Sequence, residues 1–272
     1  MKNKWLAAPY TVWMVIFIIL PLILVGFFAF TDKEGYFTLD NIMKVGQYSN
    51  VFLRSIWLGL LATVICLVLA YPLAYIISKA SFKQQTVLTM LVMMPMWMNF
   101  LLRTYAWMSL LEDNGIINNF LVSIGLPRIH MINTSGAVVL GMVYNYIPYM
   151  ILPLYSVLTK INGSVIEAAQ DLGANNVKVF MKVIIPMSMP GIISGITMVF
   201  VPAVSTFIIS KMLGGGGNLL IGDLIDMQFL GSAYNPNLGS AISLVLMVII
   251  LICMGIMNQF DDDEEGSGGV MI

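Results

Sequence analysis

Charged residues are scarce in this sequence. Only 10% of its 272 residues are Asp, Glu, Lys or Arg, whereas about 25% is usual in a soluble domain. Hydrophobic residues make up 59%, and the mean hydropathy is +0.89. A surface that faces water needs more polar side chains than this composition supplies. We therefore interpret the chain as an integral membrane protein, with membrane lipid as its surroundings.

The chain also has few histidines, few cysteines and no surplus of basic residues. The only histidine is His130, and the two cysteines, Cys66 and Cys253, lie far apart in apolar runs. These residues make neither a metal site nor a disulfide framework, so no bound metal is expected. The net charge of −1 provides no basic face for nucleic acid. A membrane-embedded enzyme would need clustered carboxylates or histidines within the apolar runs, which contain almost none.

Six apolar runs are long enough to cross a bilayer, so the sequence predicts an all-α protein with six transmembrane helices. They fall at about residues 10–30, 55–77, 86–111, 135–158, 191–213 and 239–258. The first run is about 20 residues long, which is too long for the core of a signal peptide, and we expect an uncleaved helix. Prolines occur inside five runs. Proline is tolerated in a membrane where neighbouring groups satisfy the freed carbonyls, so the helices are expected to pack together and bend.

Lysine and arginine near the ends of the runs predict the orientation, because they are enriched on the cytoplasmic side. With the N-terminus inside, the inner segments hold Lys2, Lys4, Lys79, Lys83, Lys160, Lys178 and Lys182, and the outer segments hold Lys33, Lys44, Arg54, Arg128 and Lys211. Six crossings return the chain to the same side. Both termini are therefore expected in the cytoplasm.

The segment "SVIEAAQDLGANNVKVFMKVIIP" (residues 164–186) is polar, although it lies between two apolar runs. Ser164 and Glu167 have the spacing of a capping box at the start of a helix. Gly173 suits the left-handed conformation that ends a helix. A second short helix is expected from about residue 176 to 185, and Pro186 marks the return to the membrane.

A lipid-surface helix would explain part of this segment, but it would not explain the sharp break at Gly173 or the mixed charges. A protein partner fits better. Ala168 and Ala169 leave a low surface where another protein could approach closely, and Leu172 adds apolar contact area.

"EAAQDLG", nine further residues and "VIIP" resemble the EAA motif of ABC-importer permeases. Glu167, Ala168, Ala169, Gly173 and Pro186 fall on the fixed positions of the motif. Val183 and Ile185 are conservative departures from it. The resemblance implies that this loop is the coupling helix, which docks into a groove of a cytoplasmic ATPase subunit. It also implies that ATP and Mg²⁺ bind to that partner and that this chain binds no cofactor and catalyses no reaction.

Four further segments resemble the permeases of this family that carry spermidine and putrescine. They are "LLRTYAWMSLLEDNGIINNFL" (101–121), "VYNYIPYMILPLYSVL" (143–158), "IIPMSMPGIISG" (184–195) and "GGGGNLLIGDLIDMQF" (214–229). The resemblance implies a type I ABC importer permease fold in the bacterial plasma membrane. It implies four kinds of contact: a second homologous permease, two ATPase subunits, an extracellular polyamine-binding protein and lipid. Permeases for opines, phosphonates, thiamine and iron are similar too, and a free-standing channel is a further alternative, although it would not need a coupling loop.

On this interpretation the chain divides into three parts. Residues 1–50 form an N-terminal transmembrane helix and an extracellular loop. Residues 51–258 form the permease domain, which includes the cytoplasmic coupling loop at 159–190. Residues 259–272 form an acidic tail, which we expect to be disordered because it is rich in charge and small residues.

The run "GGGGNLL" (214–220) is no phosphate loop, because it lacks the Lys-Ser/Thr pair that such a loop requires. We expect a flexible hinge there, on the outer side.

A polyamine is a flexible polycation, so its path should offer carboxylates, with cation–π contacts from aromatic rings. The candidates are Trp97, Asn99, Tyr105, Trp107, Tyr144, Asn145, Tyr146, Tyr149, Glu112, Asp113, Asp223 and Asp226. Asp223 and Asp226 are three apart and would share a helix face. The aromatic residues could equally serve as packing, and the acids as a solvated face or as contacts to the binding protein. Arg103 would repel a polyamine, so a structural or gating role is favoured for it, paired with a carboxylate.

Overall fold

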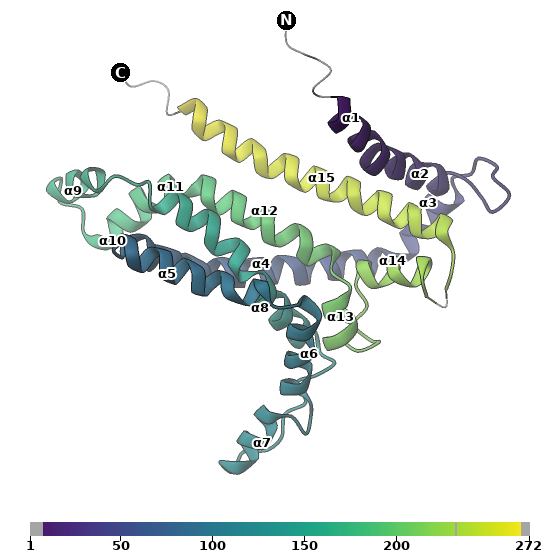
Figure 1. The fold of residues 1–272 in the computed structure, drawn as a ribbon, viewed down its shortest axis with the longest axis horizontal. Helices are drawn as coiled ribbons and strands as arrows, with labels where there is room; N and C mark the ends of the chain where they lie inside the picture. Colours follow the sequence, from purple (N-terminus) through teal and green to yellow (C-terminus); the bar gives the residue numbers. More distant parts are fainter. Residues whose placement is uncertain (1–7, 232, 268–272) are drawn as a thin grey trace, which may run out of the picture.

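The computed structural model of the protein describes residues 8–231 and 233–267 (Figure 1). Within these residues the chain is helical, and the β-structure there is limited to an isolated bridge between Thr31 and Phe37. Lys2, Lys4 and residues 268–272 lie outside the described residues. The all-α prediction is therefore confirmed for the part of the chain that the structure describes.

Short and long helices follow one another along the chain, and η marks a 3₁₀ or π turn. They are α1 (Ala8–Met14), η2 (Val15–Ile19), α2 (Leu20–Ala29), α3 (Asp40–Val45), η3 (Gly46–Tyr48), α4 (Ser49–Lys79), α5 (Phe82–Met93), η4 (Met94–Trp97), α6 (Phe100–Leu111), α7 (Ile116–Ser123), α8 (Ser135–Leu158), α9 (Gly163–Asp171), α10 (Asn176–Val179), η5 (Phe180–Ile184), α11 (Ile185–Met187), α12 (Met189–Ser205), α13 (Ile208–Leu213), α14 (Ile221–Phe229) and α15 (Pro236–Ser267).

The centre of the bundle consists of α4, α8 and α12, which pack against one another (Figure 1). Small residues make this packing close. Ala62, Cys66, Ala70 and Ala74 recur every four residues along α4, and all four are fully buried. Such a stripe of small side chains lets membrane helices approach closely. On the facing helices, a Cβ at Gly195 of α12 would lie only 2.6 Å from the sulfur of Met150 in α8.

A second group of helices covers one side of this centre. The long helix α15 packs against α2, α3, α14 and α12. Their shared core includes Phe200, Val204, Ile221 and Ile242, all of them buried. The helices α9 and α14 lie at opposite ends of the bundle, and α15 runs from the α14 end toward the α9 end (Figure 1).

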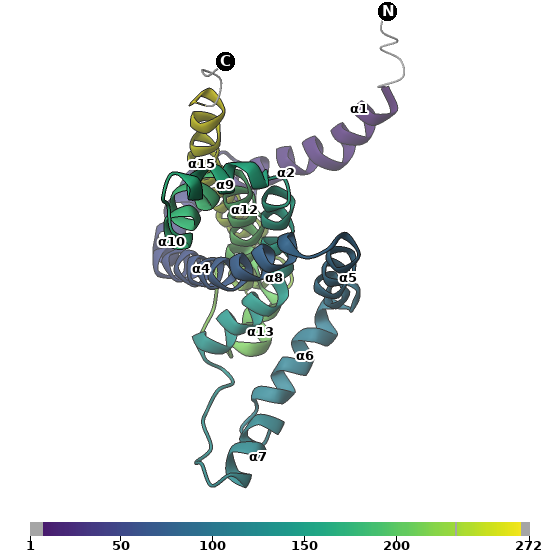
Figure 2. The ribbon, with the colours of Figure 1, turned by 90° about the vertical axis from the view of Figure 1, so that its left-hand side faces the viewer.

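Helices α5, α6 and α7 stand away from the bundle as an arm (Figure 2). Many large apolar side chains on this arm are exposed in the single chain, among them Phe82, Trp97, Met98, Leu102, Ile116 and Phe120. Within a membrane assembly such a surface suits contact with lipid or with another subunit.

Four helical stretches are long and apolar enough to cross a membrane: Pro9–Ala29, Asp40–Lys79, Ser135–Leu158 and Pro236–Met257. The number rises to six if each of two bent helix pairs is counted as one crossing. The fourth expected span coincides with α8 at both ends. At its start the side chain of Thr134 accepts a hydrogen bond from the backbone N–H of Ala137, which caps the helix.

The third and fifth runs are not the single helices that the sequence predicts. The third is divided at Met98 and Asn99, and its two halves meet at 86°. Pro95 lies in the turn before the break, and the Asn99 side chain caps α6 by accepting from the N–H of Leu101 at 2.8 Å. The fifth run is divided between α12 and α13, where Thr206 is extended.

Proline alone does not decide where these helices break. The long helices α4 and α8 continue through Pro72, Pro148 and Pro153. The break in the third run follows Pro95 and falls at Asn99, whose side chain caps the next helix. The break in the fifth run follows Pro202 and falls at the polar residue Thr206. The sixth run begins at Pro236, and α15 continues to Ser267, so helix extends into the stretch 259–267 for which a disordered tail is expected.

Candidate functional site

Residues 162–187, which we call the elbow, form a separate unit at one end of the bundle (Figure 1). Its first helix, α9, is capped by Asn162, whose side chain accepts from the N–H of Ser164 at 3.1 Å. The expected capping box of Ser164 and Glu167 is therefore wrong, because the helix begins at Gly163 and Asn162, an equally good capping residue, takes the cap position. The second helix extends through Pro186 to Met187, slightly beyond its expected end.

Gly173 produces the turn between the two elbow helices. Its φ is +82°, in the left-handed region that favours glycine. The N–H of Gly173 donates to the carbonyl of Gln170 at 2.8 Å, and the N–H of Ala174 donates to the carbonyl of Ala169 at 3.1 Å. These two bonds are the Schellman arrangement for ending a helix. The left-handed turn predicted at Gly173 is confirmed.

Most of the residues predicted to dock on a partner are exposed on the elbow. Glu167, Ala168, Gly173 and Pro186 are exposed, and Leu172 is 90% exposed. Ala169 is half-buried and packs against the main core instead. An exposed leucine beside small residues at the tip of a bundle is a surface that another protein could cover.

The elbow is joined firmly to the bundle through Phe180. Its ring packs edge-on against Tyr71 and Tyr75 of α4, with centroid distances of 5.6 and 5.9 Å. The hydroxyl of Tyr71 lies 2.8 Å from that of Ser188, at the 64° bend between the elbow and α12. Sequence reasoning missed these residues. The spacing of Tyr71 and Tyr75 on one helix face was a signal, but nothing in the sequence pointed to Phe180 as their partner.

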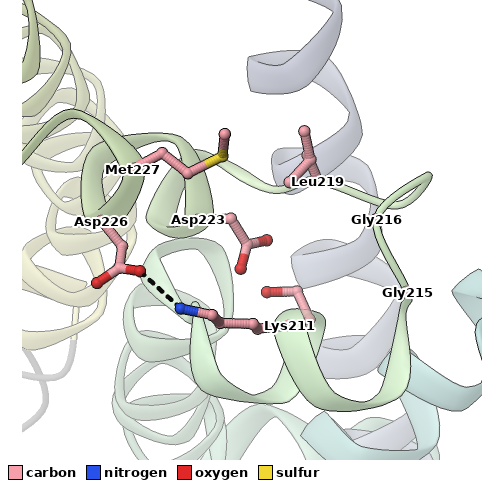
Figure 3. A pocket seen from close by; sticks show the side chains of 8 residues that line it. Lys211, Gly215, Gly216, Leu219, Asp223, Asp226 and Met227 are labelled. Carbon is pink, nitrogen blue, oxygen red and sulfur yellow. Dashed lines mark hydrogen bonds and ion pairs between the residues drawn. The ribbon is translucent and has the colours of Figure 1, made fainter. Parts of the chain in front are cut away.

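At the opposite end of the bundle, Asp223 and Asp226 of α14 face a pocket of about 170 Å³ (Figure 3). Asp223 is only 4% exposed. Its Oδ2 accepts from the N–H of Leu220 at 2.8 Å, and its Oδ1 has no hydrogen-bond partner. Burial raises the pKa of Asp223, although the Leu220 N–H, the nearby Ser210 hydroxyl and Lys211 oppose the rise. The Ser210 hydroxyl itself donates to the carbonyl of Phe207 at 3.0 Å. Asp226 forms an ion pair with Lys211 at 3.0 Å.

The glycine run beside this pocket is anchored rather than loose, contrary to the expected hinge. Arg54 of α4 donates to the carbonyl of Gly217 at 2.9 Å and to the side chain of Asn218 at 2.6 Å. Asn218 in turn donates to the carbonyls of Asn133 and Gly214. The loop is thereby tied to α4, to the segment before α8 and to the end of α13.

The other two candidate acids lie outside this pocket. Glu112 follows the end of α6 and is exposed. Asp113 lies 2.9 Å from a ring nitrogen of His130, and both side chains are more than half exposed. The four acids therefore do not form one cluster, because the pocket takes Asp223 and Asp226 alone among them.

The aromatic and amide candidates also occupy different environments. Trp97 and Tyr105 on the arm are 72% and 53% exposed. Tyr144 packs edge-on against Trp107 at 5.3 Å, and Tyr146, which is buried, lies 6.4 Å from the ring of the more exposed Tyr149. Asn99 caps α6. Asn145 is buried, and its Oδ1 has no hydrogen-bond partner. Contacts within the chain thus explain several of them without a ligand.

Arg103 does not have the carboxylate partner that the sequence suggested. It is buried, its guanidinium lies 5.9 Å from the Phe100 ring centroid, and Nε and Nη1 have no hydrogen-bond partner. Within the described residues, none of the ion pairs involves it. Those residues likewise contain no group of three or more His, Cys, Asp or Glu that could hold a metal ion.

A helical membrane bundle with an exposed elbow at one end and an acidic pocket at the other is an arrangement suited to transport. Comparison with known proteins agrees. The model of the family described as "Binding-protein-dependent transport system inner membrane component" matches residues 1–263. The chain belongs to this family, and it is a multi-pass protein of the bacterial plasma membrane.

Similar proteins place the chain more closely. It is 38% identical over 255 residues to the spermidine/putrescine transport system permease protein PotB of Escherichia coli (strain K12), covering 90% of this chain and 91% of that protein. It is also 38% identical over 250 residues to the PotB protein of Haemophilus influenzae, covering 88% and 87%.

A solved structure has the same fold. It is a crystal structure of a bacterial ABC transporter involved in the import of the acidic polysaccharide alginate. The TM-score is 0.77 with 20% identity, and the match covers 96% of each chain. The expected ABC importer permease fold is confirmed by this likeness.

Proposed function

We propose that this chain is a permease subunit of an ATP-driven importer of polyamines such as spermidine and putrescine. The observation that carries the proposal is the 38% identity to two PotB proteins, which extends over about nine-tenths of the chain. A similarity of this extent covers both the elbow and the outer pocket, so it supports a shared substrate class as well as a shared fold.

In this proposal the chain crosses the membrane six times, with both termini in the cytoplasm. The first bent helix pair forms the third crossing, and the fifth crossing begins with α12, after the bend where the elbow ends. The lysine distribution supports that orientation. The elbow then lies in the cytoplasm. Residues 221–229, which form α14, lie on the outer side, because the elbow and α14 are at opposite ends of the bundle (Figure 1).

The elbow docks on a separate ATPase subunit, and ATP with Mg²⁺ binds there. Glu167, Ala168, Leu172, Gly173 and Pro186 form the contact surface, and Ala169 supports it from the core side. Their exposure or burial is consistent with these roles. Two ATPase copies, a second homologous permease and an extracellular polyamine-binding protein complete the assembly.

The contacts of Phe180 provide the route by which the ATPase moves the bundle. When ATP binding closes the two ATPases, the elbow shifts as a rigid piece because Asn162 and Gly173 fix its shape. Phe180 presses on Tyr71 and Tyr75 of α4, while Ser188 links the same point to α12. The central helices α4 and α12 are thereby moved together, which opens the bundle to the outside.

Substrate released by the binding protein enters at the outer end. Asp223 and Asp226 supply the negative charge that a polycation requires, and Glu112 and Asp113 add to the field on the outer side. Trp97, Asn99, Tyr105, Tyr144, Asn145 and Tyr149 are the candidates for contacts along the path.

The substrate class is tested by the ATPase activity of the reconstituted assembly in lipid nanodiscs. Binding protein loaded with spermidine or putrescine is expected to stimulate ATP hydrolysis several-fold over the unloaded binding protein. If binding protein loaded with an opine, a phosphonate, thiamine or iron stimulated ATP hydrolysis instead, the polyamine assignment would be wrong and the assignment as an ATP-driven importer would stand. If the chain conducted solutes without any ATPase subunit, both assignments would be wrong.

A further inference from the structure

The pocket at the outer end of the bundle has the features of a built ligand site. Its volume is about 170 Å³, more than ten times the roughly 10–15 Å³ that a cavity needs to hold one water molecule. It is lined by Ser210, Lys211, Gly215, Gly216, Leu219, Asp223, Asp226 and Met227. Figure 3 shows the side chains of Lys211, Asp223 and Asp226 facing one another across it.

Asp223 leaves one hydrogen-bonding position open in this pocket. Its side chain is 4% exposed, and Oδ2 is occupied by the N–H of Leu220. Oδ1 is buried and has no partner. A buried carboxylate oxygen without a donor is costly. A ligand that brings a charged N–H donor into the pocket would remove that cost.

The second carboxylate is already occupied by an ammonium group from the chain itself. Nζ of Lys211 lies 3.0 Å from Oδ2 of Asp226, with the Lys211 side chain 66% exposed and that of Asp226 18% exposed. An ion pair with such an exposed member is weak, because water screens it. Lys211 therefore marks where an alkylammonium fits, and it is held loosely enough to be displaced.

We propose that this pocket binds one terminal primary ammonium group of the polyamine, between Asp223 and Asp226, and that Lys211 is the tethered competitor that the ligand must displace. The proposal rests on the proposed function and adds the binding group and its competitor. Leu219 and Met227 supply apolar contact for the adjoining methylene carbons, and the rest of the polyamine extends out of the pocket.

A divalent metal ion fits this pocket less well than an amine. Only two carboxylates line it, and a lysine ammonium lies beside them. The described residues contain no third acidic, histidine or cysteine ligand near enough to form a metal cluster. A primary ammonium needs hydrogen-bond acceptors alone, which the two aspartates provide.

The test is spermidine binding to the permease–ATPase assembly in nanodiscs without the soluble binding protein, measured by calorimetry. Asp226→Asn is expected to weaken binding about tenfold, since it removes one charged hydrogen bond. Lys211→Met is expected to tighten binding by a similar factor, since it removes the competitor. Glu34→Gln, which changes an exposed acid outside the pocket, is the matched control and should leave the affinity unchanged.

Asp223→Asn is also expected to weaken binding, but it disturbs the bond to Leu220 that starts α14, so Asp226→Asn is the decisive variant. Unchanged or weaker binding in Lys211→Met would overturn the proposal. Unchanged binding in Asp226→Asn would overturn it as well, as would saturation of the same pocket by Ca²⁺ and not by spermidine.

Uptake driven by ATP, measured on the same assemblies supplemented with binding protein, separates the two proposals. If the unmodified protein imports spermidine while both variants keep its binding affinity, the pocket proposal fails and the importer stands. If the unmodified protein neither imports nor binds any polyamine, the proposed function fails, and the ammonium site fails with it.

Discussion

The hydroxyl oxygens of Tyr71 and Ser188 lie 2.8 Å apart in the interior of the bundle, where the elbow joins α12. The Ser188 hydroxyl donates its one proton to the carbonyl of Ile185 at 2.9 Å. The Tyr71 hydroxyl is therefore the donor in the bond between the two side chains. This bond ties α4 to the bend between the elbow and α12, which lies on the proposed route from ATPase to bundle.

Replacing Tyr71 with Phe removes that bond and leaves the ring in contact with Phe180. We expect a loss of stability of about 1 kcal/mol, which is typical of one hydrogen bond. We also expect less substrate transported per ATP hydrolysed, because α4 and α12 are no longer linked at the bend. Thermal melting in detergent and the ratio of uptake to ATP hydrolysis measure the two effects.

Tyr75→Phe serves as the control for Tyr71→Phe, because Tyr75 packs on the same Phe180 ring and no hydrogen bond of its hydroxyl is found among the described residues. It should leave both quantities close to those of the unmodified protein. Equal behaviour of the two variants would contradict the role given to the hydroxyl pair.

Replacing Gly173 with Val tests the turn of the elbow. No atom lies within 4 Å of a Cβ added there, so the cost comes from the backbone alone. A β-branched residue at a φ of +82° costs roughly 1–2 kcal/mol, and the elbow relieves the strain by changing shape. We expect the variant to insert into the membrane, but less of the ATPase subunit should co-purify with it, and ATP-driven uptake should be lost.

Gly163→Val is the matched control for this change. Its Cβ would also meet open space, and Gly163 lies within α9 without a positive φ. It should retain ATPase binding and uptake. Intact coupling in Gly173→Val would show that the shape of this turn does not matter for docking.

Replacing Asn218 with Ala removes the side chain that holds the glycine-rich loop in place. Its side chain accepts from Arg54 and Ser135 and donates to two backbone carbonyls. At about 1 kcal/mol for each bond, the expected loss is on the order of 2–4 kcal/mol, visible as a lower melting temperature. Asn119→Ala, which removes one exposed bond, should have a small effect. A melting temperature unchanged by Asn218→Ala would mean that the loop is not anchored as described.

Asp223 makes stability depend on pH in a defined direction. Its pKa is raised by burial, so the folded protein holds this proton more tightly than the unfolded chain does. The contribution of Asp223 to stability therefore falls as pH rises from about 3.9, the ordinary carboxyl value, through the raised pKa, and it stays low above that value.

The difference in melting temperature between Asp223→Asn and the unmodified protein reports this effect. Over that pH range the melting temperature of the variant should rise relative to that of the unmodified protein. Lys211 and Asp226 are the charged groups that face Asp223, and they oppose each other's effect. A difference that is constant with pH, or that changes in the opposite direction, would contradict the burial of an ionisable Asp223.

The sequence predicts those parts of the fold that local chemistry decides. The ends of α8 follow from an apolar run bounded by Thr134 and the polar residues after Leu158. The turn at Gly173 follows from a glycine placed where a helix must end. The exposure of the elbow was predictable for the same reason, since a polar segment between two spans has no place in lipid.

The missed features depend on contacts between distant residues. Hydropathy is continuous across Met98 and Asn99, so it carries no information about the 86° bend there. The spacing of Asp223 and Asp226 predicted a shared face, but Lys211 belongs to another helix, and only the packing of α13 beside α14 brings it to Asp226. Phe180 reaches α4 across more than a hundred residues of sequence, which no local pattern records.

The most direct test of the account is uptake of labelled spermidine into vesicles that contain this chain with its permease partner, two ATPase subunits and loaded binding protein. The account predicts accumulation that requires ATP, that excess unlabelled putrescine reduces, and that Gly173→Val abolishes while Gly163→Val does not. Accumulation without ATP, or none in vesicles whose ATPase responds to a different loaded ligand, would contradict it.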